Sequence, residues 1–420
     1  MRAITTGDTM HVHGGFGEKV DYTARVSVKL TDPVDARLLQ HALTETQKRY
    51  PYLCVRIRKD DHAFYYEDNP DPIVLLHTPE RISLNAEETN FHLWAVCYWE
   101  EWLHLDCYHG ITDGTGMYKI LATLLYYYCK EKYGITDQTG IWTVEDTIDK
   151  EELCDPQDEL KAPVTQKYKS IEMRPAFTLE TDGNLTPSEP TIWDVEIPEE
   201  AFIRFTSAND ASPGTMVSIL LARAIDALYP NAEKDIVGAY VINARPMLQA
   251  KKTYHNCLTM ALFDYEDKIR RMPLDRQCTV YRGKTFIQSD EDRVAELMAV
   301  NAEAIRAAQD SAKTLDEKKK VFGSAFSGGE GLVTYLVSYT GKWSCPGVEG
   351  YMKEFWSHPP NTFSLMVEIG AAGGKIFLTI QQRFREDTVR EAFLKQLEEH
   401  EIPYTLKRVL ESDIAHIPEP

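Results

Sequence analysis

Apolar and polar residues alternate strictly near the start of the chain, as they do in a strand with one buried face. The alternation covers residues 22–30 and predicts the first strand. Asp32 and Pro33 then predict the start of a helix whose inner face carries apolar residues three or four positions apart. Short strands are expected at residues 53–57 and 63–66, joined by a polar turn.

A hairpin followed by a helix is expected in the middle of the first half. Residues 91–99 and 102–108 have the composition of two strands separated by a two-glutamate turn. Apolar side chains then recur at helical spacing from residue 117 to residue 128. Residues 109–116 are therefore expected in a tight turn between the end of a strand and the start of a helix.

The periodicity weakens between residues 155 and 190, where Asp, Pro, Lys, Thr and Gly are frequent. We therefore expect an N-terminal half at residues 1–160, a crossover linker at 161–190 and a C-terminal half at 191–420. Strand and helix patterns alternate again in the second half. The expected strands lie at residues 192–197, 235–242 and 332–339, the helices at 217–228, 294–308 and 387–399, and a hairpin at 363–384.

Composition and charge narrow the class of protein. The 420 residues are 43% hydrophobic and 26% charged, which suits a folded chain with a sizeable core. No basic stretch followed by an apolar run opens the sequence, and no window is long and apolar enough to span a bilayer, so we expect a cytoplasmic protein. Eight cysteines without a Cys-x-x-Cys pair fit a reducing compartment. The formal net charge of −19 argues against a nucleic-acid partner.

The sharpest chemical feature is a His-x-x-x-Asp-Gly pattern formed by His109, Asp113 and Gly114. His109 continues the parity of the apolar residues on the preceding strand, so its imidazole is expected to point toward the interior. An imidazole with a pKa near 6.5 is largely neutral at pH 7 and can accept a proton from a hydroxyl or an amine. A buried histidine beside a helix-capping aspartate is the alternative interpretation of the same residues.

Other motifs in the sequence are weaker. His11 and His13 have the spacing of metal ligands, but no third ligand lies nearby, so we expect an ordinary N-terminal arm and no metal site. The Gly-x-Ser-x-Gly elbow of many serine hydrolases is missing, which disfavours that class.

The segment from His109 to Gly114 resembles the active-site signature of the chloramphenicol acetyltransferase-like superfamily. This superfamily includes condensation domains of peptide synthetases, plant BAHD acyltransferases and microbial alcohol acetyltransferases. Weaker similarities at residues 49–53, 243–246 and 338–341 and in the C-terminal hairpin and helix extend the resemblance over nearly the whole chain. The resemblance implies an α/β fold of two subdomains. Each would be a mixed, largely antiparallel sheet flanked by helices, with the active-site tunnel between them.

The resemblance also implies roles for individual residues. His109 would be the general base, and Asp113 would pair with an arginine instead of with the histidine. Arg245 is the candidate partner, and Arg56 is the alternative, because Cys54 stands where an arginine is often found. The candidates for oxyanion or substrate contacts are Ser338, Thr340, Tyr108 and the backbone N–H near Gly114.

The activity that the resemblance implies is acyl transfer from a thioester to a small-molecule hydroxyl or amine. Tyr108 stands where condensation domains usually carry a second histidine, which favours the alcohol acetyltransferase and related branches. Acyl-CoA or an acyl-carrier thioester would be the co-substrate, with no permanently bound cofactor, in a role typical of secondary metabolism. The alternatives are a condensation-type enzyme that depends on a carrier protein, and a catalytically silent binding or scaffold module.

Overall fold

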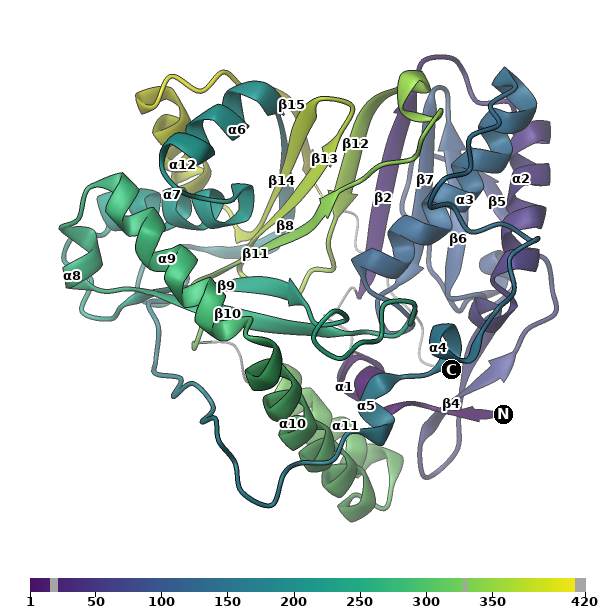
Figure 1. Ribbon diagram of the computed structural model, residues 1–420, viewed down its shortest axis with the longest axis horizontal. Helices are drawn as coiled ribbons and strands as arrows, with labels where there is room; N and C mark the ends of the chain where they lie inside the picture. Colours follow the sequence, from purple (N-terminus) through teal and green to yellow (C-terminus); the bar gives the residue numbers. More distant parts are fainter. Residues whose placement is uncertain (16–21, 328–330, 412–420) are drawn as a thin grey trace.

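Two mixed sheets flanked by helices organise the protein (Figure 1). The computed structural model describes residues 1–15, 22–327 and 331–411. Most neighbouring strands in both sheets are antiparallel, so the fold class expected from the sequence is confirmed.

The first sheet has five strands in the order β12-β2-β7-β6-β5, and only β5 and β6 run parallel. Helices α2 and α3 pack on each other and against it (Figure 1). The bounds are β2 (Thr23–Leu30), β5 (Leu75–His77), β6 (Trp94–Trp99), β7 (Trp102–Tyr108), β12 (Met352–His358), α2 (Ala36–Arg49) and α3 (Gly114–Tyr133).

The second sheet has seven strands in the order β10-β9-β11-β13-β14-β8-β15. Helices α6, α7, α9 and α12 cover one face and bury the second apolar core against it. The bounds are β8 (Pro187–Pro198), β9 (Ile236–Asn243), β10 (Leu258–Tyr265), β11 (Tyr335–Lys342), β13 (Leu365–Ala372), β14 (Lys375–Phe384), β15 (Thr405–Glu411), α6 (Glu199–Ala208), α7 (Pro213–Leu228), α9 (Leu274–Gln288) and α12 (Thr388–Glu399).

A third group of elements lies beside both sheets, at the bottom of Figure 1. Helix α1 packs against α10 and α11, and a small antiparallel sheet has the order β1-β4-β3. The bounds are α1 (Thr6–Gly14), α10 (Glu291–Ser311), α11 (Leu315–Ser327), β1 (Arg2–Ala3), β3 (Val55–Lys59) and β4 (Phe64–Asp68), with the short helices α4 (Lys150–Leu153) and α5 (Pro156–Glu159). The short helix α8 (Asp267–Arg270) lies instead beside α9 of the second sheet (Figure 1).

One strand from late in the sequence belongs to the first sheet. β12 pairs with β2, with Phe355 opposite Val28, and the buried side chains of Phe355 and Trp356 join the first core. The two sheets are therefore tied together by the chain as well as by packing. The division at residues 161–190 stays a prediction, and that segment is largely irregular until β8 begins.

The structure agrees with the sequence where periodicity is strong and differs where it is weak. Both predicted hairpins are present, as β6–β7 and β13–β14. The helix expected at Asp32 begins instead at Ala36, because Asp35 is the residue that caps it, accepting from the N–H of Leu38 at 3.0 Å. Helices α1, α6, α9 and α11 and strands β5, β10, β12 and β15 were among the elements that were not predicted. Among the helices of the described ranges, none combines the length and apolar character needed to cross a membrane.

Candidate active site

His109 lies where strand β7 ends and the turn to α3 begins. Its backbone N–H donates to the carbonyl of Tyr22 at 2.9 Å, which extends the pairing of β2 with β7 by one step. The amide of Asn256 donates to the carbonyl of His109 at 2.9 Å. The imidazole is half-buried in the wall of a cavity of about 1070 Å³.

Asp113 is fully buried and forms a bidentate ion pair with Arg245. The two guanidinium nitrogens donate to its carboxylate at 2.7 and 2.9 Å. Asp113 also caps α3, accepting from the N–H of Thr115 at 3.1 Å, and accepts from the N–H of Cys257 at 3.1 Å. Burial raises the pKa of Asp113, but the Arg245 charge and these donors outweigh it and leave the pKa below its ordinary value.

The arginine follows β9 of the second sheet, so the pair joins the two halves of the molecule directly behind the motif. Arg245 also donates to the backbone carbonyls of Thr253 at 3.0 Å and His255 at 2.8 Å. Arg56, the alternative partner, lies on β3 and pairs with Glu67 instead. Both carboxylate oxygens of Asp113 therefore accept hydrogen bonds from Arg245, so the aspartate pairs with the arginine and not with the imidazole of His109.

The environment of His109 favours a neutral imidazole. Burial lowers its pKa below the ordinary value, although the nearby negative charge of Asp113 acts in the opposite direction. Nδ1 is buried and has no hydrogen-bond partner on another residue. Hydrogen bonding by the backbone carbonyl of His109 and by the Asn256 side chain also acts to raise the pKa of His109, but burial outweighs these influences. In the neutral tautomer with the proton on Nδ1, the lone pair of Nε2 can accept a proton.

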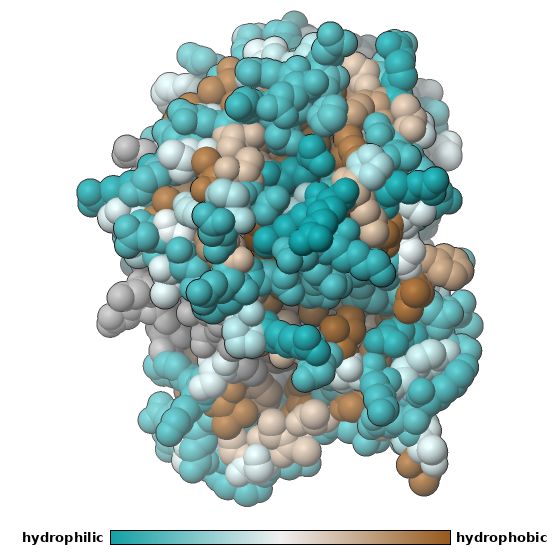
Figure 2. Space-filling view, turned by 90° about the vertical axis from the view of Figure 1, so that its left-hand side faces the viewer, coloured by the Kyte–Doolittle hydropathy of each residue, from teal (hydrophilic) through white to brown (hydrophobic). Residues whose placement is uncertain are grey.

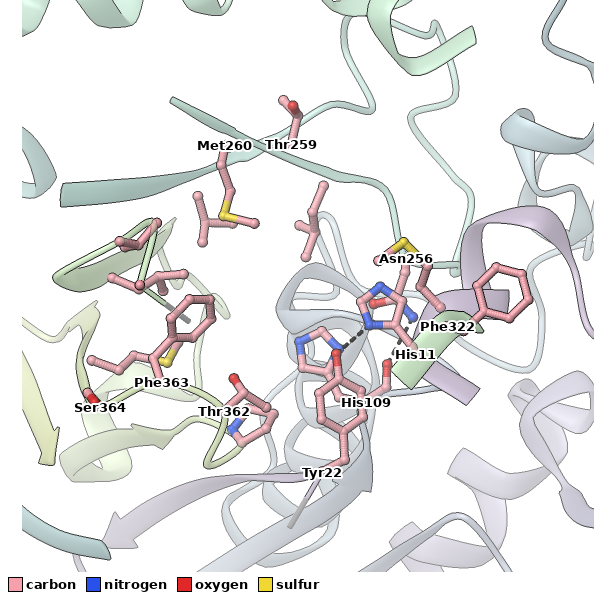
Figure 3. A pocket seen from close by; sticks show the side chains of 18 of the residues that line it. His11, Tyr22, His109, Asn256, Thr259, Met260, Phe322, Thr362, Phe363 and Ser364 are labelled. Atoms are coloured by element: carbon pink, nitrogen blue, oxygen red, sulfur yellow. Dashed lines mark hydrogen bonds between the residues drawn. The ribbon is translucent and has the colours of Figure 1, made fainter. Parts of the chain in front are cut away.

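A second histidine, His11, stands beside the first. Its ring stacks on His109 with centroids 5.7 Å apart and planes at 23°, and its Nδ1 hydrogen-bonds with the hydroxyl of Tyr22 (Figure 3). The pKa of His11 is lowered to about 4, mainly by burial and to a smaller extent by the nearby His109. This ring is therefore also neutral at pH 7. Nothing in the local sequence pattern pointed to this contact, because it joins α1 to a turn almost a hundred residues away.

The neighbouring histidine of the same helix has a different environment. His13 is buried between the rings of Phe64 and Phe322, and its Nδ1 lies 3.3 Å from the carbonyl of Thr9. Within the ranges that the structure describes, no group of three or more His, Cys, Asp or Glu side chains is placed to hold a metal ion.

The remaining residues singled out from the sequence lie close to the motif but do not line the cavity. Tyr108 is fully buried, and its hydroxyl donates to the carbonyl of His11 at 3.1 Å, so it anchors α1. Thr340 lies against Gly114: a side chain added there would place its Cβ 2.8 Å from the Thr340 hydroxyl oxygen. Ser338, two residues before Thr340 on β11, is half-buried.

A buried carboxyl that sequence reasoning missed completes this polar group. Glu368 of β13 is directly opposite Ser338 in the parallel register of β11 and β13. Burial raises the pKa of Glu368 to about 7, against the hydrogen-bonding influence of the Ser338 and Thr340 hydroxyls, which lowers it. The hydroxyls on this side of the motif therefore face a carboxyl that titrates near neutral pH.

The cavity extends from His109 along the face of the second sheet that is opposite the α7 and α12 helices. Side chains from β9, β10, β11 and β13 form one wall, and α1, α10 and α11 form another. His109, His11 and Tyr22 stand together in the close-up, with Met260 and Phe363 on other sides of the space (Figure 3). The site can therefore present a neutral imidazole to an enclosed molecule of considerable size.

No model of a protein family matches this sequence, and no curated protein matches it. Solved structures do match. The structure of F. sporotrichioides TRI101 complexed with coenzyme A and T-2 matches with a TM-score of 0.59 and 12% identity, over 91% of this chain and 95% of that chain. Polyketide synthase associated protein 5 from Mycobacterium tuberculosis matches with a TM-score of 0.60 and 12% identity, over 94% and 96%.

The condensation domain from the Monacolin K polyketide synthase MokA matches with a TM-score of 0.60 and 11% identity, over 94% of this chain and 95% of that chain. All three matches extend over more than nine-tenths of this chain. The protein therefore has the chloramphenicol acetyltransferase-like fold, with two subdomains that are each built on a mixed sheet flanked by helices.

Proposed function

We propose that the protein is an acyltransferase that moves an acyl group from a thioester to a hydroxyl or amine, with His109 as the general base. The observation that carries the proposal is a neutral, partly accessible imidazole in the wall of a large cavity, next to an aspartate that is occupied by an arginine. Such an imidazole can accept a proton at neutral pH without first losing one.

In the proposed reaction the acceptor oxygen or nitrogen attacks the thioester carbonyl while Nε2 of His109 takes its proton. The tetrahedral oxyanion needs a hydrogen-bond donor, and Ser338, Thr340 and the backbone N–H near Gly114 remain the candidates. Collapse of the intermediate breaks the C–S bond, and the imidazolium returns the proton to the leaving thiolate. His109, Asp113 and Gly114 thus form the proposed catalytic motif, with Arg245 as the structural partner of Asp113.

Acyl-CoA is the proposed donor, since TRI101 is a structural neighbour that was crystallised with coenzyme A. A carrier-protein thioester is the second candidate, because condensation domains are also among the neighbours. Cytoplasmic location and a role in secondary metabolism stay predictions from the sequence and from this resemblance.

The test is release of free thiol from a panel of short and medium acyl-CoAs with mixed alcohols and amines. Activity should require an acceptor and should fall by roughly 10²–10⁴-fold in His109→Ala, the usual contribution of a general base. His13→Ala is the matched control, because His13 lies on the same helix as His11 but outside the cavity lining. Equal inertness of the intact protein and His109→Ala with every acyl-CoA would reject the free-CoA donor. Inertness with carrier-bound donors as well would favour the silent module.

A further inference from the structure

We infer that the cavity beside His109 binds the hydrocarbon body of a large, uncharged substrate whose reactive end lies at the imidazole. This inference rests on the proposed acyl transfer, and it names the class of substrate. The volume of about 1070 Å³ lies just above the range of about 300–1000 Å³ that is usual for small-molecule sites. A two-carbon acyl group or a short alcohol would leave most of it unfilled.

The lining of the cavity is more apolar than polar, and it is adaptable. Met10, Met260, Met298 and Met366 line it together with Leu336 and Phe363. These methionines come from four different elements, α1, β10, α10 and β13, so they surround the space. An unbranched thioether side chain adjusts to irregular apolar shapes, which suits a bulky hydrocarbon ligand better than a rigid polar one.

Uncharged polar side chains, among them Gln157, Thr259 and Asn301, also line the cavity. His11, Tyr22 and Asn256 accompany His109 at the reactive end. Among the described lining residues the charged side chains other than histidine are Glu180 and Arg383, and both are next to Ser364, which lies away from His109 in Figure 3. Among the described lining residues, Arg383 is the cationic side chain that could bind the phosphates of coenzyme A. The acyl or acceptor part of a substrate therefore fits this space better than the nucleotide of coenzyme A.

Part of the apolar lining is open to solvent in the free protein. Met260 is 49% exposed and Val321 is 41% exposed, although both line the cavity. Figure 2 shows the side of the molecule that carries α8 and α9, a mainly hydrophilic face with apolar residues exposed at several places in both its upper and its lower half. Exposed apolar surface that continues into a cavity is typical of a binding site, because burying it against a ligand is favourable.

Direct binding tests the cavity independently of catalysis. The probe is the neutral fluorophore N-phenyl-1-naphthylamine, titrated into the intact protein and into His109→Ala. We expect both to bind it, and Met260→Lys to weaken binding on the order of tenfold, because an ammonium group must then lose water beside the ligand. Met173→Lys is the matched control, since Met173 is 43% exposed and does not line the cavity. Absence of probe binding, or equal weakening by the two lysine variants, would overturn the inference.

Turnover then identifies which substrate supplies the hydrocarbon. In one arm the donor is acetyl-CoA and the acceptors are straight-chain primary alcohols and amines of increasing length. In the other arm the best acceptor is fixed and the acyl chain is lengthened. kcat/KM should rise about fourfold per added methylene in one arm until the cavity is full, and Met260→Lys should abolish the rise. Turnover without any rise in either arm rejects the inference. Probe binding without turnover supports the cavity and rejects acyl transfer from free acyl-CoA.

Discussion

Replacing Asp113 by Asn removes one charge from the buried pair and nearly preserves the shape and the helix-capping oxygen. Arg245 is 1% exposed, and in the variant its guanidinium would remain buried without a carboxylate. Removing one partner of a buried pair typically costs about 3–5 kcal/mol in free energy of unfolding, mainly because the remaining charge is uncompensated. We expect a loss in this range, which is a large fraction of the 5–15 kcal/mol typical of a folded domain.

Urea unfolding of Asp113→Asn, Arg245→Met and the double variant measures this energy as a double-mutant cycle. The stability losses of the two single variants should add up to clearly more than the loss of the double variant. The excess should be larger than the roughly 0.5 kcal/mol within which the effects of independent sites add. Asp106→Asn is the matched control. Its carboxylate also accepts two bonds of 2.7 Å from a buried arginine, Arg25, but the pair lies within the first sheet.

The same variant tests whether Asp113 acts on His109 only through its charge. The charge of Asp113 raises the pKa of His109, so Asp113→Asn should move the acid limb of kcat/KM to lower pH, and Asp106→Asn should not.

A loss of stability below about 1 kcal/mol in Asp113→Asn, the level of an exposed pair, would refute the argument from burial. So would additive effects of the two substitutions.

Three further outcomes follow from the site. Because burial lowers the pKa of His109, the acid limb of kcat/KM should have its midpoint below about pH 6.5; a midpoint above about pH 6.5 would contradict the neutral base. His11→Phe keeps a ring beside His109 but loses the hydrogen bond to Tyr22, so kcat/KM should fall by up to about tenfold, while His13→Phe stays within about twofold. The pKa of Glu368, about 7 when folded, lies above the unfolded value of about 4.3, so its stabilising protonation is complete below pH 4 and lost as the pH rises through 7. Glu368→Gln should therefore be more stable than the intact protein at pH 8, by at most about 4 kcal/mol in urea unfolding, and similar at pH 4.

Local pattern was sufficient for the elements that carry the motif. The alternation in β2, the β6–β7 hairpin and the helical spacing of α3 each depend on burying one face of a short segment, which a few residues encode. The position of Asp113 at the start of α3 is equally local, because a capping carboxylate bonds N–H groups two and three residues ahead. The sequence alone thus located His109 at the end of a strand and Asp113 at the start of a helix.

Contacts between distant segments were decided by the tertiary structure. Arg245 and Arg56 were both available to Asp113, and the return of the chain after β9 determined that Arg245 lies behind the motif. His11 reaches His109 because α1 packs under the turn, and β12 enters the first sheet although it lies far along the chain. Periodicity reports which face of a segment is buried but not which segment covers it. The cavity, its methionines and its second histidine therefore emerge only when the sheets and helices pack together.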